Sequence, residues 1–167
     1  MKNIKLIVFD VDGVLTDGGI YIDDRGVETK RFHVRDGFAI RAAQSLGLKI
    51  GVLTGRSTPA VTLRMAELGI DLIIQGALDK ATGLETICQR AGVLPEEAAY
   101  VGDDLIDLPA MLRCGYPIAV ADAVEDVRAE ASFVTPSRGG HAAGRDAIEH
   151  ILRAKGLWEQ VLERFGP

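Results

Sequence analysis

One apolar run that ends in two acidic residues limits most strongly what this chain can fold into. Residues Leu6–Phe9 are apolar without interruption, and Asp10 and Asp12 follow directly, before Gly13. An unbroken run of this length is typical of a strand buried on both faces, as in a parallel sheet. Gly13 allows the sharp turn that ends such a strand. Because ligands bind at the carboxyl ends of strands in open α/β sheets, the two acids are either ordinary turn residues or part of a functional site.

Strand-like and helix-like segments alternate along the rest of the chain. Five further strands, with their polar ends, are predicted over residues 49–56, 71–76, 98–107, 116–120 and 132–135. Helical patterns are expected over residues 39–46, 59–68, 79–91, 107–112 and 142–155. This alternation predicts an α/β fold with a doubly wound, Rossmann-like parallel sheet, in a single domain over residues 1–167. Its core would be aliphatic, because 47% of the residues are hydrophobic but only 5% are aromatic.

A short insertion separates the first predicted strand from the first predicted helix. Apolar and polar residues alternate on both sides of Asp23–Gly26, so residues of about 19–33 predict a β-hairpin with a glycine-containing turn. A hairpin of this size is not stable alone, and we expect it to pack on another surface. It would serve as a flap over the carboxyl edge of the sheet or as a contact between subunits. After it, Asp36 is expected to cap the helix that begins at Ala39, beside Arg35.

The overall charge and the cysteines limit the possible partners. The net charge of -5 argues against nucleic acid or an anionic membrane as the main partner, so an anionic substrate would need local cations. No apolar run approaches the length of a membrane span and no signal sequence is recognisable, which favours a cytoplasmic protein. Cys88 and Cys114 lack metal-type spacing, and we expect free thiols in a reducing compartment.

The end of the second predicted strand carries groups that suit phosphate binding. Thr54, Gly55 and Arg56 precede a helix, so a hydroxyl, free backbone N–H groups and the helix N-terminus would meet there. The alternative is a purely structural role, in which Ser57 or Thr58 caps the helix. Both interpretations can hold, because they use different residues.

Two later strand ends add a lysine and a group of acids. Lys80 lies in the first turn of a helix that Asp79 would cap, where the helix dipole disfavours a cation. Such a conflict with a local rule favours a functional interpretation. Asp103, Asp104 and Asp107 follow the fourth strand, and a divalent cation would relieve their repulsion. Asp107 is also the expected N-cap of the next helix.

Carboxyl ends of parallel strands share one edge of a sheet, so these groups would converge. Together they supply an attacking acid, a proton donor and cations, which are the parts that phosphoryl transfer needs. In order, the motifs are Asp10-Val11-Asp12-Gly13, Thr54-Gly55, Lys80 and Gly102-Asp103-Asp104. This set resembles the haloacid dehalogenase superfamily. Nothing between the first strand and Thr54 is large enough to be a cap domain, since the hairpin is the only insertion there, so the chain resembles the branch without a cap domain.

Further segments resemble one family of that superfamily, the 3-deoxy-D-manno-octulosonate 8-phosphate phosphatases. They are Phe32–Gly37, Leu53–Ser57, Leu68–Ile70 with Gln75-Gly76, and Gly139-Gly140 with Arg145. The family usually has Gly-Gly-x-Gly-Ala-x-Arg-Glu in the late loop, which we also expect to be flexible here. This chain departs from that pattern with Ala142 and Asp146.

The resemblance implies Mg²⁺-dependent hydrolysis of a sugar-acid phosphate through an aspartyl-phosphate, in lipopolysaccharide precursor synthesis. Asp10 would attack phosphorus, and Asp12 would protonate the leaving oxygen and then activate water. The metal would be held by Asp10, the backbone carbonyl of Asp12, and Asp103. The other implied contacts are Thr54 and Lys80 with the phosphoryl oxygens, Asp104 and Asp107 with metal-bound waters or Lys80, and Gly55, Arg35, Arg56 and Arg138 with the rest of the substrate.

The resemblance also implies a homotetramer in which hairpins from four subunits meet and a neighbour's C-terminal segment lies near each site. Two alternatives stay open. One is a related phosphatase of a nine-carbon sialic-type sugar phosphate, which tends to differ at the Thr-Gly-Arg position, so Arg56 favours the eight-carbon substrate. The other is a phospho-accepting receiver module, whose acceptor acid lies on a later strand than Asp10 does here.

Overall fold

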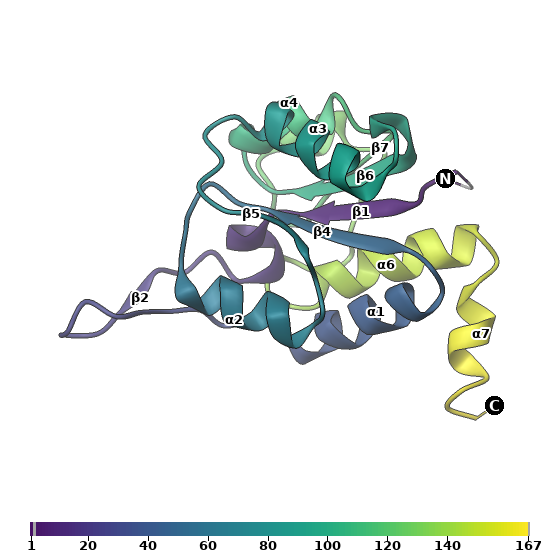
Figure 1. The fold of residues 1–167 in the computed structure, drawn as a ribbon, viewed down its shortest axis with the longest axis horizontal. Coiled ribbons are helices and arrows are strands. Elements are labelled where there is room, and N and C mark those ends of the chain that lie inside the picture. Colours follow the sequence, from purple (N-terminus) through teal and green to yellow (C-terminus); the bar gives the residue numbers. More distant parts are fainter. Residues whose placement is uncertain (2, 167) are drawn as a thin grey trace.

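A six-stranded parallel sheet forms the centre of the molecule (Figure 1). The computed structural model describes residues 1 and 3–166. The sheet strands are β1 (Leu6–Phe9), β4 (Lys49–Leu53), β5 (Leu72–Ile74), β6 (Ala98–Gly102), β7 (Tyr116–Ala119) and β8 (Phe133–Val134). Their order is β5-β4-β1-β6-β7-β8, and every neighbouring pair is parallel. The predicted doubly wound fold is therefore confirmed.

Helices cover both faces of this sheet. They are α1 (Val34–Ser45), α2 (Pro59–Glu67), α3 (Lys80–Ala91), α4 (Leu108–Met111), α5 (Glu125–Glu130), α6 (Ala143–Ala154) and α7 (Trp158–Leu162). Figure 1 shows α1, α2 and α6 on one side of the sheet, and α3 and α4 on the other. None of the helices in the described part of the chain is long and apolar enough to cross a membrane.

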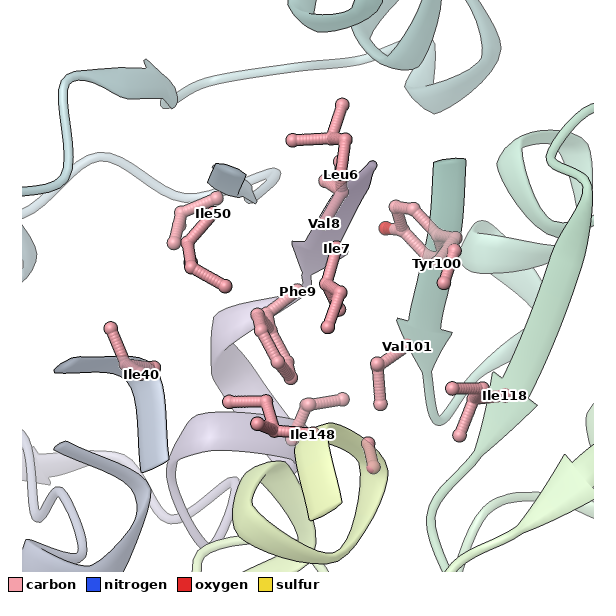
Figure 2. Packing of buried hydrophobic residues seen from close by; sticks show 14 of the residues in the cluster. Leu6, Ile7, Val8, Phe9, Ile40, Ile50, Tyr100, Val101, Ile118 and Ile148 are labelled. Carbon is pink, nitrogen blue, oxygen red and sulfur yellow. The ribbon is translucent and has the colours of Figure 1, made fainter. Parts of the chain in front are cut away.

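The first strand lies in the middle of the hydrophobic core. All four residues of β1 have no exposed surface, as the uninterrupted apolar run predicts. In Figure 2, Phe9 points towards Ile148 of α6, while Tyr100 and Val101 flank β1 from β6. Burying a large apolar side chain stabilises a fold by about 1.5–3 kcal/mol, so this packing holds β1 firmly in the centre of the sheet.

The predicted hairpin is present and extends away from the sheet (Figure 1). Its strands, β2 (Tyr21–Ile22) and β3 (Glu28–Thr29), pair antiparallel. A bridge between Thr16 and Phe32 closes its base. Ile20 and Ile22 are each more than 60% exposed in a single copy of the chain, so the hairpin leaves apolar side chains without cover.

Two helices differ from the sequence-based expectation. Helix α1 begins at Val34 rather than Ala39, and the side chain of His33, not Asp36, caps it by accepting a hydrogen bond from the N–H of Arg35. Asp36 instead accepts the N–H of Arg145 at 2.7 Å and thereby caps α6, whose own N-cap residue provides no side-chain hydrogen bond. Burial raises the pKa of Asp36 to about 6. Helix α5 was not predicted, because six mostly charged residues around one buried valine carry no clear period.

Candidate active site

The end of β1 lies where the sheet changes its winding direction. From β1 the chain adds β4 and β5 on one side, and β6, β7 and β8 on the other. In doubly wound sheets this switch point opens a crevice at the carboxyl ends of the strands. Asp10 follows β1 directly and is only 3% exposed. A short helical turn, Val11–Leu15, comes after it. Gly13 permits that turn, since its φ of 82° is left-handed.

A cavity of about 250 Å³ opens at this point. Its lining comes from the ends of β1, β4 and β6, which are far apart in the sequence. The lining residues are Asp10, Asp12, Gly13, Gly18, Thr54, Gly55, Arg56, Asp103, Asp104 and Ile106. The structure therefore brings together the acid pair, the Thr-Gly-Arg segment and the later acids, as the sequence predicts for a parallel sheet.

Lys80 lies behind this cavity instead of lining it. Its ammonium group contacts Asp10 Oδ2 at 2.7 Å and Asp107 Oδ1 at 2.6 Å, and its side chain is 2% exposed. Asp79 caps α3 as predicted, by accepting the N–H groups of Ala81 and Thr82. The two carboxylates thus explain why a lysine occupies the first turn of a helix despite the dipole.

Asp107 is a buried acceptor, and this corrects its predicted role as a cap. It stands at the N-cap position of α4, but its side chain makes no capping bond there. Oδ1 accepts from Lys80 and from the hydroxyl of Tyr100 at 2.7 Å, and Oδ2 accepts the N–H groups of Asp103 and Asp104. Because four donors occupy its oxygens, Asp107 holds Lys80 and the loop after β6 in place.

The carboxylates at this site outnumber the cations. Oxygen atoms of Asp10, Asp103 and Asp107 all lie within 4.8 Å of one another. Burial, and then the charge of Asp107, raise the pKa of both Asp10 and Asp103, although Lys80 acts in the opposite direction. A single ammonium group cannot neutralise three carboxylates, of which Asp10 and Asp107 are buried and Asp103 is partly buried. Hence the site favours an additional positive charge.

The donor set fits a hard divalent cation such as Mg²⁺. Asp10 Oδ1 is buried without a hydrogen-bond partner, so a coordinating oxygen is available there. The carboxylate of Asp103 lies against Gly13: a Cβ atom added to Gly13 would lie only 1.9 Å from Asp103 Oδ2, so any larger residue at position 13 would clash with it. Glycine at this position therefore lets the Asp103 carboxylate approach the turn that carries Asp12.

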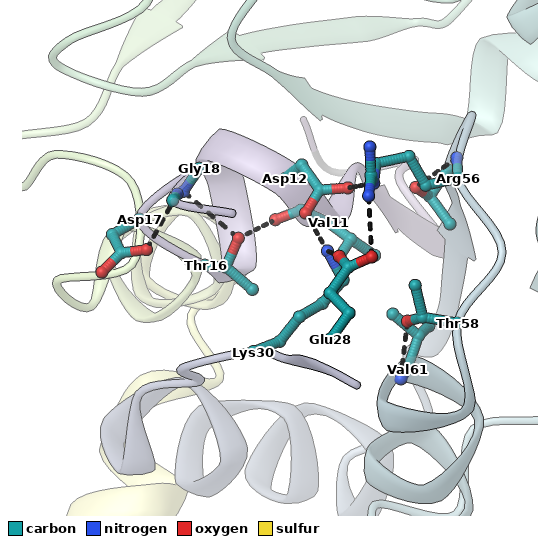
Figure 3. A network of polar contacts seen from close by, with 12 residues as sticks. Val11, Asp12, Thr16, Asp17, Gly18, Glu28, Lys30, Arg56, Thr58 and Val61 are labelled. Carbon is teal, nitrogen blue, oxygen red and sulfur yellow. Dashed lines mark hydrogen bonds and ion pairs between the residues drawn. The ribbon is translucent and has the colours of Figure 1, made fainter. Parts of the chain in front are cut away.

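The hairpin contributes ion pairs that the sequence analysis missed. Lys30 Nζ lies 2.5 Å from Asp12 Oδ1 and 3.0 Å from Glu28 Oε1, and Glu28 Oε2 lies 2.7 Å from Arg56 (Figure 3). Burial opposes the charge of Lys30, but the two carboxylates outweigh it and raise the pKa of the lysine. The available signal was the position of Lys30 two residues after Glu28, because residues two apart in an extended segment point to the same side, and Lys30 directly follows β3.

Two predicted substrate contacts lie elsewhere in a single copy of the chain. Arg35 is exposed in the first turn of α1 and does not line the cavity. Arg138 lines a separate polar cavity beside Asp17 and Tyr21 and contacts His141. Of the predicted arginines, Arg56 is the one that lines the cavity after β1.

The late loop packs directly on the turn after β1, so it is less free than expected. A Cβ on Gly139 would lie 1.7 Å from the carbonyl oxygen of Gly13, and the N–H of Gly140 donates to the carbonyl of Val14. Ala142 keeps the left-handed conformation, with φ of 76°, that a glycine adopts more easily. The loop is thus closely packed despite the departure at Ala142.

Comparisons with known proteins agree with this geometry. A family described as haloacid dehalogenase-like hydrolases matches residues 72–143. The 3-deoxy-D-manno-octulosonate 8-phosphate phosphatase KdsC of Haemophilus influenzae is 43% identical over 156 residues, which cover 93% of this chain and 87% of that protein. The protein of the same name from Escherichia coli K12 is 42% identical over 160 residues, covering 96% and 85%.

A solved structure is similar over almost the whole chain. It is the 3-deoxy-D-manno-octulosonate 8-phosphate phosphatase of Moraxella catarrhalis in complex with a magnesium ion, a phosphate ion and KDO. It is 40% identical, has a TM-score of 0.95, and covers 98% of this chain and 94% of that one. Since the likeness in sequence and in structure spans nearly all residues, this chain belongs to the 3-deoxy-D-manno-octulosonate 8-phosphate phosphatase family of the haloacid dehalogenase-like hydrolases.

Proposed function

We propose that this protein hydrolyses 3-deoxy-D-manno-octulosonate 8-phosphate to the free sugar acid and phosphate, in lipopolysaccharide precursor synthesis. The observation that carries the proposal is the likeness to phosphatases of this name over more than nine-tenths of the chain. The cavity after β1 supports it, because an acid pair and a threonine line it and a buried lysine contacts Asp10 from behind.

The proposed reaction has two steps. In the first, an oxygen of Asp10 forms a bond to phosphorus while the bond from phosphorus to the sugar oxygen breaks, and Asp12 gives that oxygen a proton. In the second, water attacks the aspartyl-phosphate and Asp12 accepts the proton of the water. The products are the sugar acid, inorganic phosphate and the original enzyme.

The other lining residues, together with Lys80 behind Asp10, support this reaction by charge and position. Thr54 and Lys80 would donate to the transferring phosphoryl oxygens, and Lys80 also orients Asp10 through their contact at 2.7 Å. Gly55 and Arg56 lie at the rim, where a sugar carboxylate or hydroxyl would contact them. The proposed site leaves out Arg35 and Arg138, since they lie outside this cavity.

Asp10, the carbonyl of Asp12, and Asp103 would hold Mg²⁺. When bound, the ion neutralises the phosphoryl oxygens and the crowded carboxylates. Asp104 lines the cavity and Asp107 holds Lys80, so both are proposed to support the ligands instead of binding the metal themselves.

A panel of phosphorylated sugar acids, assayed for phosphate release with Mg²⁺, tests the substrate. We expect the eight-carbon phosphate to have the highest kcat/KM and EDTA to abolish turnover. A preference of about tenfold or more, equal to about 1.4 kcal/mol, for the nine-carbon sialic-type phosphate would overturn the assignment while leaving the chemistry intact. A single phosphate released per protein molecule would instead indicate the receiver alternative.

We further propose that the protein is one phosphatase domain that assembles into a homotetramer through its hairpins. Exposed Ile20 and Ile22 on a hairpin too small to be stable alone support this assembly. We expect light scattering on the purified protein to give about 72 kDa, four times the 17.9 kDa of one chain. A monomer at micromolar concentration would contradict the proposal. Two free cysteines fit the proposed cytoplasmic location.

A further inference from the structure

The hairpin places one cation beside the acid pair. The side chain of Lys30 is 1% exposed, although the hairpin that carries it extends into solvent (Figure 1). Its ammonium group lies between two carboxylates, Asp12 at 2.5 Å and Glu28 at 3.0 Å. A lysine is rarely buried unless its charge is paired, so this arrangement holds the side chain at one point.

The contact with Lys30 makes the two oxygens of Asp12 unequal. Oδ1 accepts the hydrogen bond from Lys30, whereas Oδ2 lies 4.0 Å from the Nε atom of Arg56. Arg56 and Asp12 both line the cavity after β1. Oδ2 is therefore the oxygen of Asp12 on the side of Arg56, a lining residue, while Oδ1 is held by Lys30 of the hairpin.

We propose that Lys30 is a positioning residue for Asp12: it binds Oδ1 and so turns Oδ2 towards the oxygen of the leaving sugar. This inference rests on the proposed function, in which Asp12 gives a proton to that oxygen. Lys30 itself is not among the residues that line the cavity. Its effect is confined to the two steps in which Asp12 gives or accepts a proton, and kcat/KM reports on the first of them, the formation of the aspartyl-phosphate.

Glu28 connects this contact to the rim of the cavity. One oxygen of Glu28 contacts Lys30 and the other contacts Arg56 at 2.7 Å, as Figure 3 shows. The hairpin, Asp12 and the segment after β4 thus form one set of ion pairs. Removal of Lys30 leaves Asp12 and Glu28 without the cation between them, so the Asp12 carboxylate loses its fixed orientation.

Two substrates that differ in the leaving group test the inference. A sugar alkoxide needs a proton as it leaves, whereas 4-nitrophenolate leaves from 4-nitrophenyl phosphate without one. For Lys30→Met, we expect kcat/KM for the best sugar phosphate of the panel to fall about 30-fold, and kcat/KM for 4-nitrophenyl phosphate to change less than about threefold. Lys30→Arg keeps a donor and a charge, and should recover most of the loss.

Matched variants separate positioning from damage to the fold. Arg25→Met removes an exposed hairpin cation that pairs with Asp23, and should leave kcat/KM for both substrates unchanged. If Lys30→Met does not fold by circular dichroism, Lys30→Gln takes its place under the same criteria. Equal losses on both substrates, or no loss on the sugar phosphate, would overturn the role of Lys30. Failure of the wild-type protein on the eight-carbon phosphate alone would overturn only the proposed substrate.

Discussion

Replacing Asp10 by asparagine is expected to lower kcat by about 10⁴-fold or more, because a neutral amide does not form the proposed bond to phosphorus. This loss corresponds to about 5 kcal/mol of activation free energy. Asp10 is 3% exposed and contacts Lys80, so its carboxylate is held in one position at the end of β1. Steady-state release of phosphate from the sugar phosphate with Mg²⁺ measures the effect.

The same variant is expected to fold at least as well as the wild-type protein. Asparagine removes one of three crowded carboxylates, whose repulsion and burial raise the pKa of Asp10. Asp71→Asn, which changes an exposed carboxylate outside the cavity, is the matched control and should retain full activity. Near wild-type turnover by Asp10→Asn, with a melting temperature that shows an intact fold, would refute the covalent mechanism.

Local patterns were sufficient to predict the sheet and the residues at its edge. The apolar run before Asp10 specifies a buried strand, and parallel strands bring their carboxyl ends to one edge. Asp10, Thr54 and Asp103 therefore line one cavity, as predicted from segments that are far apart in the chain. The residue types that follow each strand carry this information, since no distant contact is needed to recognise them.

Roles that depend on a distant partner could not be read from local patterns. Asp36 and Asp107 have the type and position of helix caps, but their carboxylates bind Arg145 N–H and the Lys80 and Tyr100 side chains. Capping rules describe only the nearest turn of backbone. Lys30 was missed for a related reason, because its partner Asp12 becomes adjacent only when the hairpin folds back.

Lys80→Met is expected to impair both stability and catalysis. The methionine keeps an apolar stem in a position that is 3% exposed, but leaves Asp10 and Asp107 without their shared cation. Removing one partner of a buried ion pair typically lowers the free energy of unfolding by about 3–5 kcal/mol. In a chain of this size that loss lowers the melting temperature by about 10 °C, which calorimetry in EDTA measures.

Catalysis should fall further than stability explains. Lys80 also donates to the phosphoryl oxygens in the proposed reaction, and the loss of such a contact lowers kcat by about 10²–10³-fold at a temperature where the variant is folded. Lys5→Met, which removes a surface ion pair with Glu97, is the matched control and should change the melting temperature by less than about 2 °C. If Lys80→Met lost stability but kept kcat, Lys80 would hold Asp10 and Asp107 in place without contacting the phosphoryl group. Removing a buried ammonium group from between two carboxylates should lower the stability, kcat or both. If Lys80→Met kept both the melting temperature and kcat of the wild-type protein, the ion pairs of Lys80 with Asp10 and Asp107 would have no energetic role.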